Sequence, residues 1–375
     1  MNKKIRVGVL LGGRSVEHEV SLVSAASVIN GLDKEKYEVF PIGITPDGRW
    51  LSARDAVAML KARSSAENLP EHLILPDPRK QGLVDINNSE KDAVQNIDVV
   101  FPVMHGTFGE DGTVQGLLEL ADVPYVGAGV LGSAVGMDKI IQKHVLESAK
   151  IRVAQGIFFS MAEYEEDENK IIDRIELELE YPCFVKPSNT GSSIGISKAH
   201  DRKELTDAIT LAAEYDRKLL IEKSIEKARE IECSVMGNDK PIASVLGEIV
   251  PSNEFYDYDA KYVDGKSTAI IPADLPKWAV RKIQYIACKA FKILDCAGMA
   301  RVDFLVQSNG AKIYLNEINT IPGFTSISMF PKLWEASGLS YPDLLDRLIQ
   351  LALERHRAKS KLKKTYQPKT DWYKG

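Results

Sequence analysis

The sequence predicts an α/β and α+β chain of three domains, of which the first is doubly wound. Its 375 residues exceed one ordinary core and suit two or three domains of roughly 100 to 150 residues each. Buried strand-like runs alternate with helical patterns up to residue 127, and strands mixed with helices and a short glycine loop follow. We therefore expect domains at residues 1–127, 128–222 and 223–357, followed by a basic tail at 358–375.

The first domain opens with an apolar run at residues 5–11, which Gly12-Gly13 closes. Valines then recur at helical spacing up to Asn30-Gly31, which predicts a buried parallel strand leading into a helix. Further strands are expected at residues 37–44, 97–104 and 123–126, which together predict a small doubly wound sheet. The polar segment 53–96 is predicted to be a surface insertion.

The pattern changes after Gly127. In the second domain we expect a helix at 133–149, a strand ending at Lys186, a Gly/Ser loop, and strands at 194–197 and 219–223. In the third domain we expect strands at 230–236 and 241–250, a polar loop rich in tyrosine, a long helix at 276–294, and strands at 299–306 and 312–319.

Composition excludes several classes of protein. Hydrophobic residues make up 44% and charged residues 27%, as in a globular protein with a substantial core. The net charge is −5, and residues 355–375 hold eight Lys or Arg against one acid, so the remainder carries −12. A basic tail can be a nucleic-acid arm or a solvated helix end, and the acidic body favours the second reading. We expect no nucleic-acid partner.

The four cysteines form no CxxC pair and predict buried thiols in a reducing compartment. No apolar stretch approaches the ~20 residues that span a bilayer. We therefore expect a cytoplasmic protein with no membrane segment.

The clearest candidate site lies on the last two expected strands. Arg301 and Asp303 share one face of a strand by period-2 alternation, and Glu317 and Asn319 share one face of the next. Hard oxygen ligands of this kind suit Mg²⁺, and an Arg beside them would hold phosphoryl oxygens. The alternative is the polar face of an ordinary hairpin with an Arg–Asp pair. Apolar residues at the alternating positions favour a site.

Two further groups of residues carry possible chemistry. Lys139 and Lys186 precede the glycine loop at residues 188–195, whose backbone N–H groups could wrap a polyphosphate, although such loops are usually plain hairpin turns. Glu17 and His105 follow strands of the first domain, where ligands bind in such sheets. Glu17 could equally be a helix-start carboxylate and His105 a satisfied turn residue. Residues 109–112 are interpreted as a helix entry.

Seven strings in order resemble the D-alanine:D-alanine ligase family, from Val7 to about Leu351. They are LLGGRSVEHEVS (10–21), HGTFGEDGTVQG (105–116), MDK (137–139), FVKPSNTGSSIG (184–195), EFYDYDAKY (254–262), RVDF (301–304) and NEINTIPGFTSISMFP (316–331). The resemblance implies a three-domain ATP-grasp fold with ATP between the central and C-terminal domains. It also implies a homodimer. Ser224 stands where some relatives carry a bulky residue, beside two of the residues expected at the adenine.

The resemblance also implies roles for individual residues. For ATP these are Lys139 and Lys186 on the α- and β-phosphates, Lys261 on the γ-phosphate, Ser192 in the closing loop, and Glu222, Lys223, Ile225 and Glu230 on adenine and ribose. Asp303, Glu317 and Asn319 would hold two Mg²⁺ or Mn²⁺ ions. Glu17 and His105 would bind the first D-alanine, and Ser328 the carboxylate of the second. Arg301 and the backbone N–H of Gly323 would stabilise an oxyanion, while Ser192 and Tyr262 would orient the second substrate.

The implied reaction passes through an acyl phosphate, formed when the first D-alanine attacks ATP and consumed by the amine of the second, for cell-wall peptidoglycan synthesis. The loop at 251–265 would be a lid that excludes water. Rival functions are a D-alanine:D-lactate or D-alanine:D-serine ligase, a binding protein that has lost its chemistry, and a more distant ATP-grasp carboxylase. The metal ligands and Arg301 argue against the second, and the missing bicarbonate and biotin signals argue against the third.

Tyr262→Phe is predicted to shift the acceptor from D-alanine towards D-lactate, because it removes one hydroxyl while keeping the ring. Loss of a buried hydrogen bond costs roughly 1 to 3 kcal/mol, or about 5- to 150-fold in relative specificity. The measurement is competition between the two acceptors at several pH values, scored by product mass. An unchanged product ratio at every pH would remove Tyr262 as the residue that sets acceptor choice.

Overall fold

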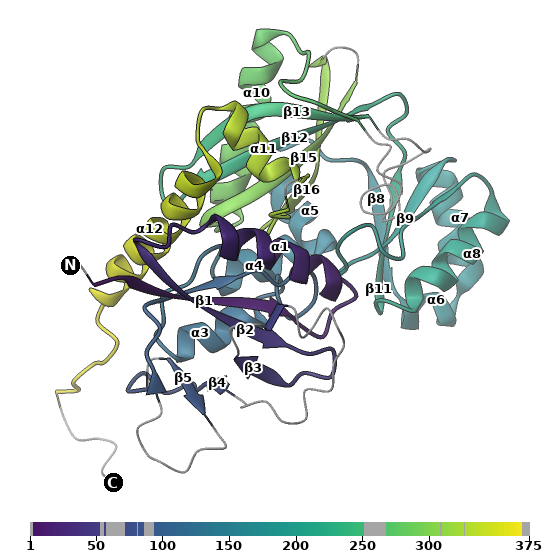
Figure 1. Ribbon diagram of the computed structural model, residues 1–375. Helices are drawn as coiled ribbons and strands as arrows, with labels where there is room; N and C mark the ends of the chain where they lie inside the picture. The colour runs from purple at the N-terminus through teal and green to yellow at the C-terminus, as the bar shows by residue number, and fades with distance from the viewer. Residues whose placement is uncertain are drawn as a thin grey trace.

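The computed structural model describes residues 3–52, 56–57, 72–80, 82–85, 94–250, 268–307, 310–325 and 327–369. Three sheets of four, four and five strands form its frame, beside a small sheet of β4 (His72–Ile74), β5 (Leu83–Asp85) and β6 (Val94–Gln95) (Figure 1). In the part of the chain that is described, no helix is long and apolar enough to cross a membrane.

The first sheet has the order β3-β2-β1-β7, with β1 (Ile5–Gly12) parallel to β2 (Tyr37–Ile44) and to β7 (Val99–Pro102). β3 (Trp50–Ser52) is antiparallel to β2 at one edge. Helices α1 (His18–Gly31) and α3 (Thr113–Leu120) follow β1 and β7, as a doubly wound domain requires.

The prediction of a strand at residues 123–126 is wrong. That segment makes one isolated parallel bridge, between Tyr125 and Val100 on β7. Its neighbour Pro124 has no N–H to donate, and Asp122 has a φ of 55°, so the ladder cannot lengthen on that side.

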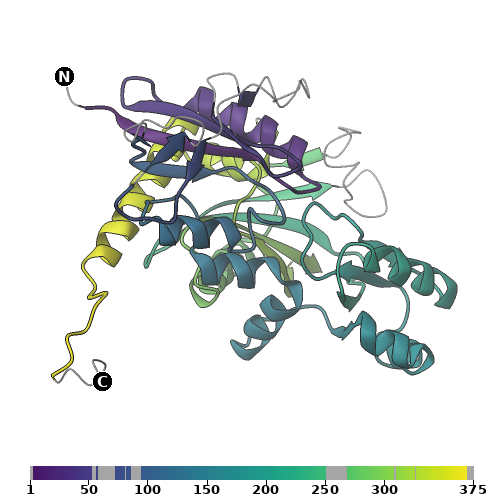
Figure 2. The same cartoon turned by 90° about the horizontal axis from the view of Figure 1, so that it is seen from below.

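The second sheet is antiparallel and has the order β10-β9-β11-β8. Its strands are β8 (Gly156–Ser160), β9 (Cys183–Pro187), β10 (Ser197–Ala199) and β11 (Lys218–Lys223), and helices α6 (Met161–Glu166), α7 (Glu168–Glu178) and α8 (Arg202–Ala213) accompany them. The strand expected at 194–197 begins only at Ser197, because Ser192 and Ser193 have left-handed φ values of 50° and 59° and extend the loop. This part projects from one end of the molecule (Figure 2).

The single helix expected at 133–149 is two helices, α4 (Val130–Met137) and α5 (Lys139–Ser148). Asp138 separates the two helices, because its ψ of 100° is not helical. Its carboxylate accepts hydrogen bonds from the N–H groups of Ile140 and Ile141, each at 3.1 Å. An N-cap of this kind starts a new helix, so Lys139 stands at the first position of α5.

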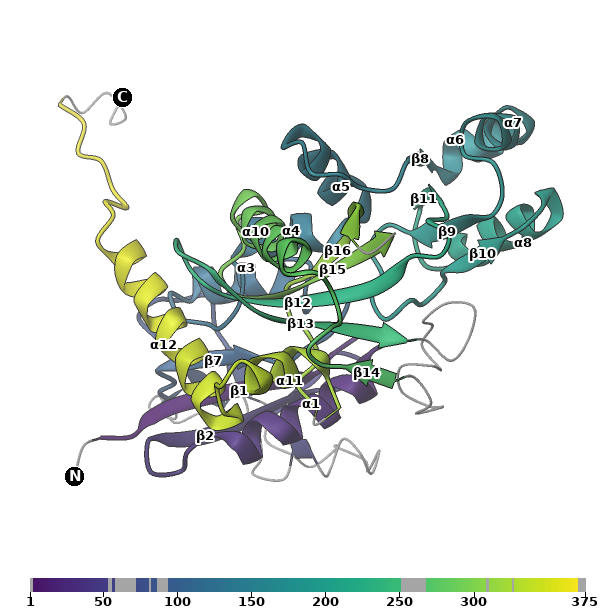
Figure 3. The ribbon, with the colours of Figure 1, turned by 90° about the horizontal axis from the view of Figure 1, so that it is seen from above.

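The third sheet is antiparallel and has the order β14-β13-β12-β15-β16. Its strands are β12 (Arg229–Gly237), β13 (Ile242–Val250), β14 (Thr268–Ile270), β15 (Gly298–Gln307) and β16 (Lys312–Asn319). The last two strands form a hairpin, with Arg301 opposite Asn319 and Asp303 opposite Glu317. Helix α10 (Lys277–Ile293) covers one face, and α11 (Met329–Ala336) and α12 (Tyr341–Ser360) lie on the other (Figure 3).

The first and third sheets share one hydrophobic core, which includes residues of β1, α1, β7, α11 and α12. At its centre, the Phe324 ring stands edge-on to Phe101 with centroids 5.7 Å apart, and it lies 5.4 Å from Phe330. Arg355 near the end of α12 stacks 4.4 Å from the Tyr125 ring and donates to backbone carbonyls of residues 125 and 127. The Phe324 contacts fix the loop after β16 against the first sheet, and the Arg355 contacts hold the end of α12 against residues 125 and 127.

Phe101→Ala is expected to destabilise the protein by about 3 to 5 kcal/mol, because a fully buried ring is removed from the contact between two sheets. Urea unfolding followed by circular dichroism measures the loss. Phe158→Ala is the matched control, since this β8 ring is 47% exposed and should cost far less. Equal losses for the two variants would contradict the shared core.

Candidate active site

A cleft lies where the three sheets meet, and the site residues line it in two connected halves. One half is lined by Glu17, His105, Gly191, Ser192, Asn319, Gly323 and Ser328, and the other by Lys186, Glu222, Lys223, Ile225, Glu230 and Asp303. Arg301, Glu317 and Glu232 line both halves. A charged group at these three positions can therefore act on ligands in either half.

The hairpin of β15 and β16 presents its polar face to the cleft. Arg301 donates to both carboxylate oxygens of Asp303, at 2.8 and 2.7 Å, and the Asn319 amide donates to the same carboxylate at 3.1 Å. Burial opposes the charge of Arg301, but Asp303 and Glu232 outweigh it and hold the pKa of the guanidinium well above its ordinary value. Arg301 is thus a fixed positive charge.

Glu232 is a site residue that the sequence reasoning missed. It is buried, lies 3.2 Å from the Arg301 guanidinium, and pairs across the strands with Asp303, which in turn pairs with Glu317. Three carboxylates therefore stand in a row across β12, β15 and β16. The signal was available, because period-2 alternation places Glu232 on the same face of β12 as Glu230.

The expected metal ligands Asp303, Glu317 and Asn319 lie side by side on this face. Within the described ranges, no three side chains of the His, Cys, Asp and Glu types gather closely enough to hold a metal ion. The expected set contains two carboxylates and one amide oxygen, which is a donor chemistry that suits Mg²⁺ or Mn²⁺.

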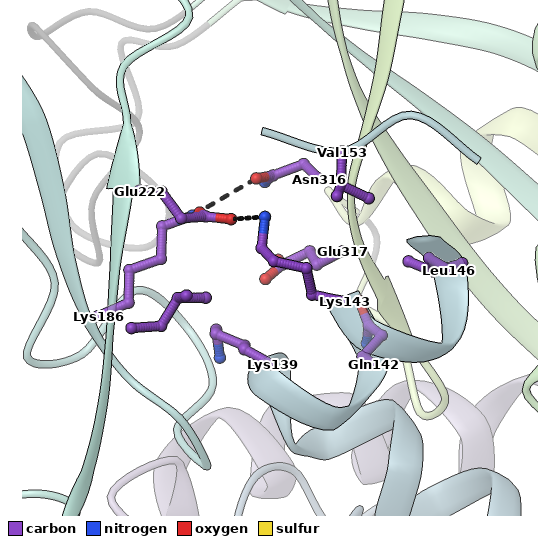
Figure 4. Close-up of a pocket in the computed structure, with 10 residues that line it drawn as sticks. Lys139, Gln142, Lys143, Leu146, Val153, Lys186, Glu222, Asn316 and Glu317 are labelled. Carbon is purple, nitrogen blue, oxygen red and sulfur yellow. Dashed lines mark hydrogen bonds and ion pairs between the residues drawn. The ribbon is translucent and has the colours of Figure 1, made fainter. Parts of the chain in front are cut away.

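Lysines on α5 and β9 converge on a buried carboxylate beside this face (Figure 4). Lys143 and Lys186 each lie 2.5 Å from a different oxygen of Glu222. Burial alone would raise the pKa of Glu222, but the two ammonium groups lower it to about 2. The Lys139 ammonium donates to the Thr190 carbonyl at 2.5 Å, and burial lowers its pKa. Lys143 was not among the sequence candidates.

The glycine loop closes over Glu17, which precedes α1 and is 4% exposed. Ser192 donates its hydroxyl hydrogen bond to the Glu17 carboxylate. A Cβ at Gly191 would lie 2.3 Å from Glu17 Oε2, and a Cβ at Gly106 would lie 2.5 Å from the same atom. The carboxylate therefore occupies the space that a side chain at either of these two glycines would fill.

His105 and Glu110 anchor the loop that follows β16. His105 Nδ1 donates to the Ile321 carbonyl at 3.1 Å, and Nε2 accepts from the Ser24 hydroxyl at 3.0 Å. Burial lowers the pKa of His105 to about 4, so the ring is neutral at pH 7. Glu110 accepts from the N–H groups of Ile321 at 3.1 Å and Gly106 at 2.8 Å. His105 is therefore both a satisfied turn residue and part of the cleft wall.

Glu110 is another residue that the sequence reasoning did not place in a site. Residues 109–112 do lead into α3, which begins at Thr113, as interpreted. The Glu110 side chain nevertheless turns into the cleft, and burial together with the charge of Glu17 raises its pKa. Its position follows from the fold and carries no local signal.

Gly323 and Ser328 sit at the far wall of the first half. Ser328 precedes α11, and its hydroxyl accepts a hydrogen bond from the Thr325 N–H at 3.1 Å. A Cβ at Gly323 would lie 2.8 Å from that hydroxyl oxygen, so the backbone of residue 323 passes close to Ser328.

Comparisons with known proteins agree with this geometry. Family models described as D-ala D-ala ligase N-terminus and C-terminus match residues 6–128 and 145–350. A D-alanine–D-alanine ligase of Acetivibrio thermocellus is 51% identical, with 95% of this chain and 98% of the relative covered. One from Thermoanaerobacter pseudethanolicus is 54% identical, with 96% and 99% covered. The chain belongs to the D-alanine–D-alanine ligase family.

Solved structures of similar proteins agree with the ATP-grasp fold expected of this family. The D-alanine-D-alanine ligase from Coxiella burnetii superposes with a TM-score of 0.82 at 40% identity, covering 96% of both chains. The VanG D-Ala:D-Ser ligase from Enterococcus faecalis also gives 0.82, at 37% identity, covering 93% of this chain and 100% of the other. The fold alone therefore does not separate the two acceptors.

In this family member, the remaining expected residues divide into two groups. Glu230, Lys223 and Ile225 line the second half of the cleft together with Lys186, and Lys223 also pairs with the exposed Glu180 at 2.8 Å. Lys261, Tyr262 and the expected lid at 251–265 lie outside the described residues.

Gly191→Ala is expected to lower activity without unfolding the ligase, because the new methyl group meets the movable end of Glu17 and displaces its carboxylate. We expect kcat/KM for D-alanine to fall by at least about tenfold, equivalent to ~1.4 kcal/mol. Gly116→Ala on α3 is the control, since its Cβ would meet nothing within 4 Å. Normal kcat/KM in Gly191→Ala, or equal losses in both variants, would contradict the placement of Glu17.

Proposed function

We propose that the chain joins two D-alanine molecules into D-alanyl-D-alanine at the expense of ATP, through an acyl phosphate. The observation that carries this proposal is that Arg301 and Glu317 line both halves of the cleft. Lys186 lies in one half and Glu17 in the other, so a phosphorylated carboxylate formed between them would meet the same guanidinium in both chemical steps.

ATP would occupy the half between the second and third sheets. Lys139 and Lys186 would contact its α- and β-phosphates, and Lys261 the γ-phosphate. Glu222, Lys223, Ile225 and Glu230 would surround adenine and ribose. Buried ammonium groups support this proposal, because charge pairs are far stronger in a water-poor cleft than at the surface.

Asp303, Glu317 and Asn319 would hold two Mg²⁺ or Mn²⁺ ions, whose chemistry is to neutralise the negative charge of the phosphate oxygens. Arg301 lies beside this set and is held by Asp303 and Glu232. Its guanidinium would stabilise negative charge on the transferred group and on the tetrahedral oxyanion, together with the backbone N–H of Gly323.

Glu17 would bind the ammonium group of the first D-alanine, and His105 would hold the loop beside it. The substrate carboxylate attacks the γ-phosphorus and ADP leaves. The amine of the second D-alanine, whose carboxylate Ser328 would bind, then attacks the acyl carbon, loses a proton and expels phosphate. Ser192 and Tyr262 would orient this second substrate, and Ser192 already contacts Glu17.

The product would serve peptidoglycan synthesis. A homodimer, a cytoplasmic location and the domain division after residues 127 and 222 stay predictions. D-serine is the competing acceptor, since the D-Ala:D-Ser ligase named above has a similar fold.

A phosphate-release assay tests the function, with ATP and Mg²⁺ and with D-alanine, L-alanine, D-lactate or D-serine as the candidate substrates. We expect rapid release with D-alanine alone, dipeptide as the product, and loss of activity when EDTA removes the metal. If both acceptors are supplied together and more D-alanyl-D-serine than D-alanyl-D-alanine forms, the assignment of D-alanine as the acceptor is rejected. Release without any amino acid would indicate a plain ATPase.

A further inference from the structure

Glu222 is a buried carboxylate with two buried ammonium groups, one on each oxygen. It is 5% exposed, with Lys143 2.5 Å from Oε1 and Lys186 2.5 Å from Oε2. Figure 4 shows the three side chains approaching one another from α5, β9 and β11. One carboxylate would be neutralised by one cation, so the second lysine needs its own explanation.

The two lysines differ in their freedom to move. Lys143 is 8% exposed, also donates to the Ala154 carbonyl at 2.5 Å, and lines the small pocket drawn in Figure 4. Lys186 reaches the Asn316 amide oxygen at 3.4 Å and also lines the second half of the cleft, where ATP is proposed to bind. The second contact of Lys186 is the longer one and its side chain faces the cleft, so Lys186 can turn towards a ligand there, whereas two short contacts hold Lys143 away from the cleft.

A move of Lys186 towards phosphate would leave Glu222 with one cation fewer. An uncompensated carboxylate in the interior is strongly unfavourable, so without another partner Glu222 would hold Lys186 back. Lys143 removes this conflict because it stays in place. We propose that Lys143 is a positioning residue that keeps Glu222 paired and oriented while Lys186 transfers to the phosphates of bound ATP.

This inference rests on the proposed use of ATP and adds a residue to that site. The proposal predicts that loss of Lys143 affects mainly ligands that carry phosphates. Adenosine needs the Glu222 pocket but does not draw Lys186 away, whereas ATP needs both. Loss of Lys143 should therefore weaken ATP binding more than adenosine binding, while a purely structural role would weaken both alike.

The experiment is calorimetric binding of Mg-ATP and of adenosine to the full chain without D-alanine. We expect Lys143→Met to weaken ATP binding at least about tenfold and adenosine binding less than about threefold. Lys143→Arg keeps a cation and should stay within about threefold of wild type for ATP. Lys289→Met is the matched control, because Lys289 also donates to a backbone carbonyl, that of Ala149 at 2.7 Å, and lines no part of the cleft.

A double-mutant cycle with Glu222→Gln isolates the charge. In that background the carboxylate that contacts Lys186 has lost its charge, so adding Lys143→Met should change ATP affinity less than about twofold. Lys143→Gln replaces Lys143→Met if the latter does not fold, since it keeps a donor for Ala154 without the charge.

Two results would overturn the proposal: equal losses for ATP and adenosine, or the same loss of ATP affinity in the Glu222→Gln background. Nucleotide binding is measured without amino acid, so a failure to form dipeptide, which would reject the proposed function, leaves this test intact.

Discussion

The need to give every buried carboxylate a partner is the constraint on which the rest of this structure depends. Glu17, Glu222 and Glu232 are each less than one-tenth exposed, and each would cost on the order of several kcal/mol to bury without a partner. The chain supplies Ser192 for the first, Lys143 and Lys186 for the second, and Arg301 for the third. Arg301 and Glu232 lie on neighbouring strands of the third sheet, and Lys186 and Glu222 on neighbouring strands of the second. Ser192 and Lys143 instead reach Glu17 and Glu222 from other parts of the fold, so these two contacts form only when the domains have docked.

The cleft lies at the junction of the sheets because hydrophobic packing brings the first and third sheets together there. The Phe101–Phe324 contact brings the loop after β16 against the first sheet, and His105 and Glu110 then hold the backbone of Ile321 from both sides. Hydrophobic packing thus sets the position of the loop, and two polar side chains fix its orientation. The backbone of Gly323, two residues after Ile321, is thereby held beside the first sheet as well.

The features that the sequence could predict are those that depend on local periodicity. Alternation along 299–306 and 312–319 placed Arg301 with Asp303, and Glu317 with Asn319, on one face of each strand. The structure pairs the two strands and brings those faces together. The break at Asp138 was missed because helical spacing continues through it, while one N-cap side chain decides the outcome. Glu110 and Lys143 were missed because their roles come from contacts with residues far away in the chain. Their positions follow from docking, which no local pattern encodes.

Arg301 shows how charge neutralisation and chemistry are combined in one residue. Two carboxylates on neighbouring strands hold its guanidinium, so the side chain cannot follow a ligand into either half of the cleft. In the proposed reaction the reacting groups must therefore come to Arg301. A charge already in place needs little reorganisation when negative charge develops on the transferred group. Lys186 is the opposite case, since its proposed role requires movement, and a movable cation needs a fixed one behind it. The different packing of Lys143 and Lys186 around Glu222 provides that pair.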